Sequence, residues 1–226
     1  MKMARLLHIT MFFPAAIGLV MVVRRSLVIT GVTDALNPPA NSPFSAGTIP
    51  GNPPFDSGFT QHSFITFLHI LPGALFMILG PLLFLPAIHS RYPRFHRRSE
   101  GVVIVCGYII GLSALLLPFV IKPIGGLNEA AATSFFAIWF LLALAMASYT
   151  SNPTRSDPAL HHEWMIRMFG IGLAIGSIRL IVVLFFLFSG LPPQVFFGTA
   201  FWIGFTLHLI LAEAWINYSR KSITVR

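Results

Sequence analysis

The chain is poor in charged residues for its length of 226. Only 10% of its residues are charged, whereas soluble domains carry about 25%. Hydrophobic residues make up 55% of the chain, and the mean hydropathy is +0.78. Acidic residues are scarcer than basic ones, at 7 against 15, which gives a net charge of +8. These charges lie at the ends of apolar runs, a pattern of membrane topology, so a nucleic-acid partner is excluded.

Cysteine is nearly absent. The single cysteine, Cys106, lies inside an apolar run, so the chain has no internal disulfide and no CxxC metal or redox motif. We expect a free cysteine in the core. The sequence also lacks a Ser or Cys nucleophile motif and an HExxH motif, which argues against a hydrolase.

Long apolar runs are abundant. Each has at least 18 residues, and about 20 residues cross a bilayer. The runs cover residues 6–23, 62–88, 96–121, 130–149, 158–188 and 194–218. Helices satisfy their own backbone groups in lipid, so the sequence predicts an all-α membrane protein with a bundle of six transmembrane helices. Pro93 and the Asp157–Pro158 pair are placed to open two of these helices.

Composition divides the chain into three parts. Residues 1–25 form an N-terminal transmembrane helix, in which Pro14 should introduce a kink. Residues 26–61 are rich in proline, glycine and asparagine, so we expect an extended extramembrane loop. Residues 62–226 form a five-helix transmembrane core with a basic C-terminal tail.

Basic residues predict the orientation. The stretch HSRYPRFHRR at residues 89–98 carries four arginines and is expected to be a cytoplasmic loop. With both termini cytoplasmic, 11 basic residues lie on the inner side and 4 on the outer side, which together are all 15. The outer four are Arg24, Arg25, Lys122 and Arg179. The pair Arg24–Arg25 fits poorly with the positive-inside rule, by which basic residues collect on the cytoplasmic side. We expect a multi-pass protein of the cell inner membrane.

Polar residues inside the spans are costly and functional by default, and histidines stand out among them. His69, Arg179, His208 and Glu213 fall within spans, whereas His96 and His161 lie near helix ends. A glycine follows 11 residues after each of four histidines, at Gly73, Gly80, Gly107 and Gly172.

A haem between helices needs imidazole ligands and small neighbouring residues. We therefore predict haem b, with iron ligated by His69 and His208 or by His96 and His161, and with Arg179 on a propionate. Two simpler interpretations stay open. The histidines near helix ends would be interfacial residues, and the pairs Gly107–Gly111 and Gly172–Gly176 would be helix-packing seams.

Several motifs resemble one known family. The chain reads His69-Ile-Leu-Pro-Gly73, then His96-Arg97, and later HHEWMIR at residues 161–167 followed by Arg179. Together these resemble the bacterial integral membrane family catalogued as domain of unknown function 2306, over residues 62–218. One departure is the glycine after His96-Arg97, which comes one residue late, at Gly101. The resemblance implies a multi-span membrane protein with no established activity. It singles out His69, His96, His161, Arg167 and Arg179.

Three functions are compatible with these features. The first is a haem-binding redox or electron-transfer protein, with Arg167 and Arg179 helping to bind the cofactor and with other subunits of a membrane redox complex as partners. The second is an accessory or assembly subunit of a larger membrane complex without its own cofactor. The third is a small proton-coupled transporter that uses His208, Glu213 and Arg179.

Overall fold

The computed structural model describes residues 2–32, 57–151 and 157–224. Within these ranges the chain is all helical, without strands. Its helices are α1 (Lys2–Ile29), α2 (Ser57–Gln61), α3 (Ser63–Leu83), α4 (Pro86–Arg91), α5 (Pro93–Val120), α6 (Gly126–Thr150), α7 (Pro158–Phe188) and α8 (Pro193–Thr224).

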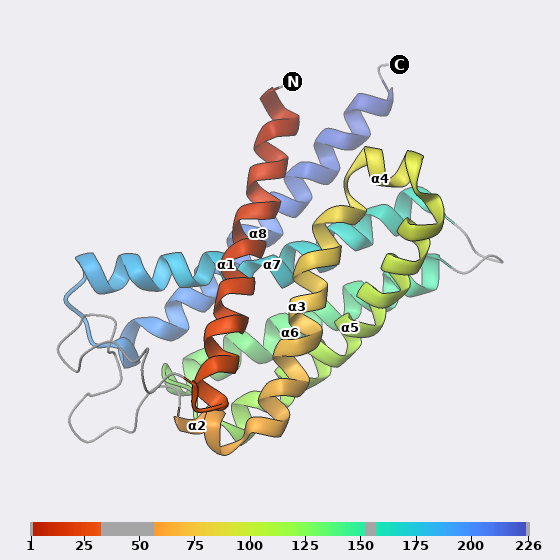
Figure 1. Cartoon of the computed structure of the whole chain (residues 1–226). Coiled ribbons are helices and arrows are strands. Elements are labelled where there is room, and N and C mark those ends of the chain that lie inside the picture. The colour runs from red at the N-terminus through yellow and green to blue at the C-terminus, as the bar shows by residue number, and fades with distance from the viewer. Residues whose placement is uncertain (1, 33–56, 152–156, 225–226) are drawn as a thin grey trace.

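Six of the described helices are long and apolar enough to cross a membrane, which confirms the predicted number of spans. They are α1, α3, α5, α6, α7 and α8. Figure 1 shows the N- and C-terminal ends beside the end of the bundle that carries α4, and α2 at the opposite end. We call these the α4 end and the α2 end. Which of them faces the cytoplasm stays a prediction, as does the identity of the membrane.

The predicted boundaries need three corrections. Helix α1 continues to Ile29, past the predicted domain boundary at residue 25. Residues 57–61 of the predicted loop form α2, while residues 33–56 lie outside the described part of the chain. The second predicted span is two helices, because α3 ends at Leu83 and Pro86 starts α4. A proline at the first position of a helix has no backbone donor to lose, so it favours a new start there.

Two predicted helix openers are confirmed. Pro93 is the first residue of α5. The Asp157 side chain caps α7 by accepting a hydrogen bond from the backbone N–H of Leu160 at 3.0 Å. Cys106 is buried and free, as expected.

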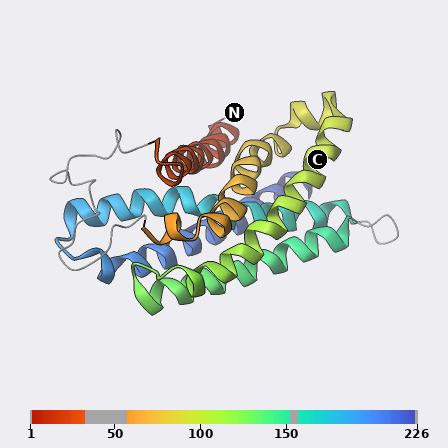
Figure 2. The ribbon, with the colours of Figure 1, turned by 60° about the horizontal axis from the view of Figure 1, so that its bottom comes forward.

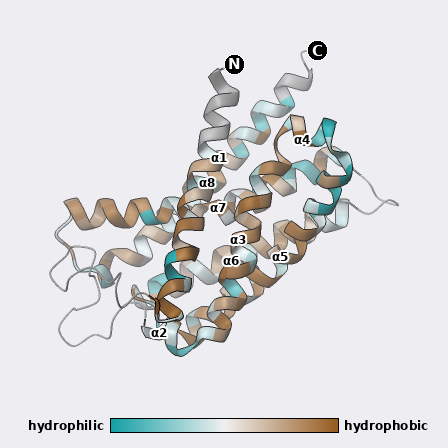
Figure 3. Cartoon of the chain, in the orientation of Figure 1, coloured by the Kyte–Doolittle hydropathy of each residue, from teal (hydrophilic) through white to brown (hydrophobic). Residues whose placement is uncertain are grey.

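Helix α7 runs through the middle of the bundle and packs against α1, α6 and α8. Figure 2 shows α1 on one side of the bundle and α6 on the opposite side, and α1 packs against α3 and α7. Gly176 of α7 lets α1 cross closely, because a Cβ there would overlap the backbone of Pro14. In Figure 3 the helices are mostly brown, and teal residues gather around α4 and the start of α5.

Candidate functional site: a cavity at the α2 end

One cavity lies among the helix halves at the α2 end. Its volume is about 340 Å³, within the usual range of roughly 300–1,000 Å³ for small-molecule sites. Side chains from α1, α2, α3, α5, α6, α7 and α8 line it. Most of the lining is apolar, with the aromatic residues Phe76, Phe136, Phe140 and Phe205 among the lining residues. An apolar ligand body would therefore be well accommodated there.

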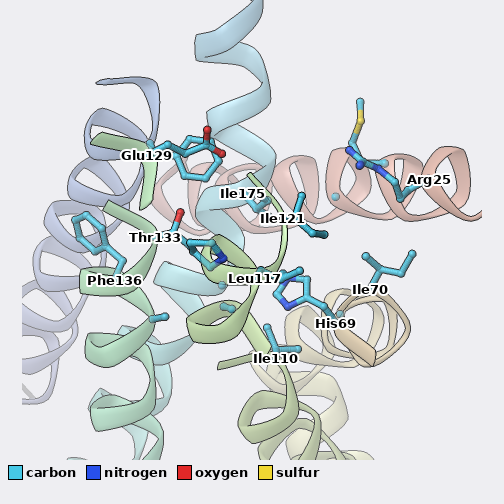
Figure 4. Close-up of a pocket in the computed structure, with 18 of the residues that line it drawn as sticks. Arg25, His69, Ile70, Ile110, Leu117, Ile121, Glu129, Thr133, Phe136 and Ile175 are labelled. Carbon is cyan, nitrogen blue, oxygen red and sulfur yellow. The ribbon is translucent and has the colours of Figure 1, made fainter. Parts of the chain in front are cut away.

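His69 presents one ring nitrogen to this cavity. Its Nδ1 atom lies 2.9 Å from the Ser113 Oγ atom. The Ser113 hydroxyl donates its hydrogen to a backbone carbonyl, and the Ile109 oxygen lies 2.6 Å away. The hydroxyl oxygen therefore accepts a hydrogen bond from His69. Nδ1 therefore carries the proton, and Nε2 keeps its lone pair. The ring also forms a hydrogen bond with the Ile110 backbone, and Figure 4 shows it among the residues that line the cavity.

Gly73 keeps the space beside His69 open. It lies one helical turn after His69 and lines the cavity, and a Cβ built there would meet no atom within 4 Å. The other glycines at the 11-residue offset serve close packing. A Cβ at Gly107 would lie 3.1 Å from Leu144, and one at Gly80 would overlap the Phe169 ring. The bundle thus contains both closely packed glycines and one beside an open space.

Positive charge predominates around the cavity. Arg24, Arg25, Lys122 and Arg179 line it, against a single carboxylate among the described lining residues, Glu129. Glu129 accepts a hydrogen bond from the backbone N–H of Gly125 at 2.7 Å. Figure 4 shows Arg25 and Glu129 at separate places on the wall. The described lining thus combines apolar side chains with basic ones, and Glu129 interacts electrostatically with Arg179.

His208 lies at a different cavity. This second space, of about 250 Å³, is lined by residues of α1, α7 and α8. His208 is only 5% exposed, and its Nε2 atom lies 2.8 Å from Ser177 Oγ. The structure therefore places His69 and His208 against different serines and different cavities. One haem ligated by both histidines stays a prediction that this arrangement does not support.

His96 and His161 meet at the α4 end, around a carboxylate. His161 Nε2 lies 3.1 Å from Glu100 Oε1, and His161 Nδ1 lies 2.8 Å from the Ala147 carbonyl oxygen. His96 Nδ1 is 3.9 Å from the other Glu100 oxygen. Both nitrogens of His161 thus face acceptors, so neither offers a lone pair to a metal. Across the described residues no group of three or more His, Cys, Asp or Glu could hold a metal ion.

Arg167 also lies away from the α2-end cavity. It binds Glu213 of α8 through two hydrogen bonds, from Nε at 2.6 Å and from Nη2 at 3.1 Å. Beside it, Glu163 accepts two hydrogen bonds of 2.5 Å from Arg220. These pairs join α7 to α8 at the α4 end. A cofactor role for Arg167 stays a prediction.

The three residues of the transporter hypothesis are spread over three places. Glu213 is paired with Arg167, Arg179 lines the α2-end cavity, and His208 lines the second cavity.

Several residues of these sites were not singled out from the sequence. Ser113 is 44 positions from His69, so no local pattern connects them. Glu100 follows His96 by one helical turn, and this i,i+4 spacing was an available signal. The poor fit of Arg24 and Arg25 to the positive-inside rule was another, since both line the cavity.

Comparison with known proteins gives one match. A family model described as "Predicted membrane protein (DUF2306)" matches residues 66–216, about two thirds of the chain. No curated protein and no solved structure matches.

Proposed function

Since the chain belongs to the DUF2306 family of predicted membrane proteins, we propose a function from the geometry of its own residues: it would bind haem b in the α2-end cavity, with His69 holding the iron. A bound haem would supply one-electron transfer. The chain would contribute the ligand, the apolar enclosure and the positive charges that hold the propionates.

The observation that carries the proposal is the state of His69. A metal-binding histidine usually donates its second ring N–H to a nearby acceptor, which fixes the tautomer and the ring orientation. Ser113 is such an acceptor for Nδ1, at 2.9 Å, and His69 lines the cavity, so Nε2 would be the iron ligand. The open space at Gly73 lies on the same helix one turn away.

The remaining features support a ligand with acidic groups. Arg179 of α7 lines the cavity, where it interacts electrostatically with Glu129, and its positive charge would attract a propionate. The aromatic side chains of the lining would exclude water from the apolar part of the ligand. This assignment uses one histidine, whereas the sequence led us to expect a pair.

The test is an absorption spectrum of the detergent-purified full-length protein, made in cells with ample haem and measured oxidised and dithionite-reduced. We expect a Soret band and reduced α and β bands, and we expect the variant His69→Ala to lose them. His208→Ala is the matched control, since that histidine lies at the second cavity, and it should keep the spectrum. A featureless spectrum of the unmodified protein, or bands that survive His69→Ala, would refute the proposal.

A further inference from the structure

Four arginines lie close together in the chain at the α4 end. Arg91 is the last residue of α4, and Arg94, Arg97 and Arg98 lie in the first two turns of α5. All four are exposed. Figure 3 shows hydrophilic residues gathered in this region, at one end of mostly apolar helices. We call these four residues the arginine cluster.

The arginines of α5 share one face of that helix. Residues three and four positions apart are neighbours on a helix surface, and Arg97 and Arg98 follow Arg94 at these spacings. Another face of α5 turns toward the bundle. His96 Nε2 lies 3.2 Å from a backbone carbonyl oxygen of α3, and Ser99 is buried. The three arginines of α5 therefore lie on the outside of the bundle.

The carboxylates of the described chain leave most of this positive charge unneutralised. Over residues 2–32, 57–151 and 157–224, no arginine of the cluster forms a salt bridge. Glu100 lies 3.1 Å from His161 Nε2, and within the cluster it interacts electrostatically with Arg97. Arg167 and Arg220, at the same end, are instead paired with carboxylates of α8 and α7. The cluster is thus complementary to a partner that carries negative charge.

The length of α5 fits a position of the cluster among lipid headgroups. Helix α5 has 28 residues, so at 1.5 Å per residue it is about 42 Å long. The hydrocarbon core of a bilayer is about 30 Å thick, and the headgroup regions extend it to about 40–45 Å. Tyr92, which lies between Arg91 and Arg94, is 55% exposed, and tyrosine is enriched at the membrane–water interface.

We propose that the arginine cluster binds the headgroups of anionic phospholipids. Their phosphates would accept charge-assisted hydrogen bonds from the guanidinium groups, and basic segments beside membrane-spanning helices are attracted to anionic lipid surfaces. A zwitterionic phospholipid carries a compensating positive group, so it would bind more weakly. Lipid binding would fix the depth of the α4 end in the bilayer. It is independent of haem binding, because the cluster and the α2-end cavity lie at opposite ends of the bundle (Figure 1).

The test compares phosphatidylglycerol with phosphatidylcholine of the same acyl chains. Each lipid is titrated into the detergent-purified full-length protein, and native mass spectrometry gives the affinity of the first bound lipid. We expect phosphatidylglycerol to bind at least about tenfold more tightly, because each arginine near an anionic lipid surface contributes roughly fivefold.

Two triple variants test whether the cluster causes this preference. Replacing Arg91, Arg94 and Arg98 together by glutamine should reduce the preference to about twofold or less, with the affinity for phosphatidylcholine unchanged. Arg97 stays in place because it interacts with Glu100. Replacing the same three residues by lysine is the matched control, since it keeps the charge and should keep most of the preference.

Three outcomes would refute the proposal. The first is equal affinity of the unmodified protein for the two lipids. The second is a preference for phosphatidylglycerol that survives in the glutamine variant or is lost equally in the lysine variant. The third is displacement of phosphatidylglycerol by an equal concentration of inorganic phosphate, which would indicate a site for free phosphate instead of a lipid surface.

Discussion

The two ends of the bundle handle charge differently. At the α4 end the carboxylates Glu213, Glu163 and Glu100 lie against Arg167, Arg220 and His161, and the arginines at positions 91, 94, 97 and 98 are exposed at the surface. At the α2 end four positive residues and one described carboxylate surround a cavity of about 340 Å³. Basic side chains at the α4 end thus join helices or lie at the surface, whereas those at the α2 end line a cavity, where Arg179 interacts electrostatically with Glu129. This difference supports our proposal that a ligand binds at the α2 end and that the α4 end has a structural role.

The sharpest way to break this contrast is to fill the cavity. Gly73→Phe would place a ring in the open space beside His69, so we expect haem affinity to fall by about a hundredfold or more while the fold persists. Haem titration and size-exclusion chromatography measure the two effects. Gly101→Phe is the matched control, because Gly101 is an exposed helical glycine at the α4 end whose Cβ would also meet no atom within 4 Å. Equal losses of haem binding in both variants would contradict the placement of the ligand.

A change at the α4 end should affect stability alone. Glu100→Gln removes the charged acceptor of His161 Nε2, so we expect the free energy of unfolding to drop by roughly 2 kcal/mol. Haem affinity should stay unchanged, because the cavity lining does not include Glu100. Chemical denaturation measures the free energy of unfolding, and haem titration measures the haem affinity. A loss of haem binding here would favour the predicted ligand pair His96 and His161.

A smaller effect is expected from the residue that orients His69. Ser113→Ala removes the acceptor of the Nδ1 proton, and loss of such a partner costs about tenfold to a hundredfold in metal affinity. We expect a loss near tenfold in haem binding. Ser177→Ala removes the equivalent contact from His208 at the second cavity and should leave haem binding unaltered. If the two serine variants behave alike, the assignment of His69 rather than His208 is wrong.

The sequence was sufficient for the spans but not for the site. Hydropathy and length predict six crossing helices because lipid imposes one requirement on every such segment, and Pro93 and Asp157 mark helix starts locally. Proline position alone did not show that Pro86 opens a separate helix. Helical phase could not pair histidines between helices, since the meeting of His161 with Glu100 depends on how α5 and α7 pack. The serine partners of His69 and His208 depend on the same tertiary packing.

Rescue of a ligand-free variant by imidazole tests the assignment of His69 most directly. His69→Gly removes the ring and leaves a space beside Gly73, into which free imidazole can bind as a replacement ligand. We predict that purified His69→Gly shows no Soret shift when haem is added, and that millimolar imidazole restores the spectrum of the unmodified protein. The same imidazole should not change the spectrum of His208→Gly. If His69→Gly binds haem as the unmodified protein does without imidazole, His69 is not the ligand and the α2-end cavity is not a haem site.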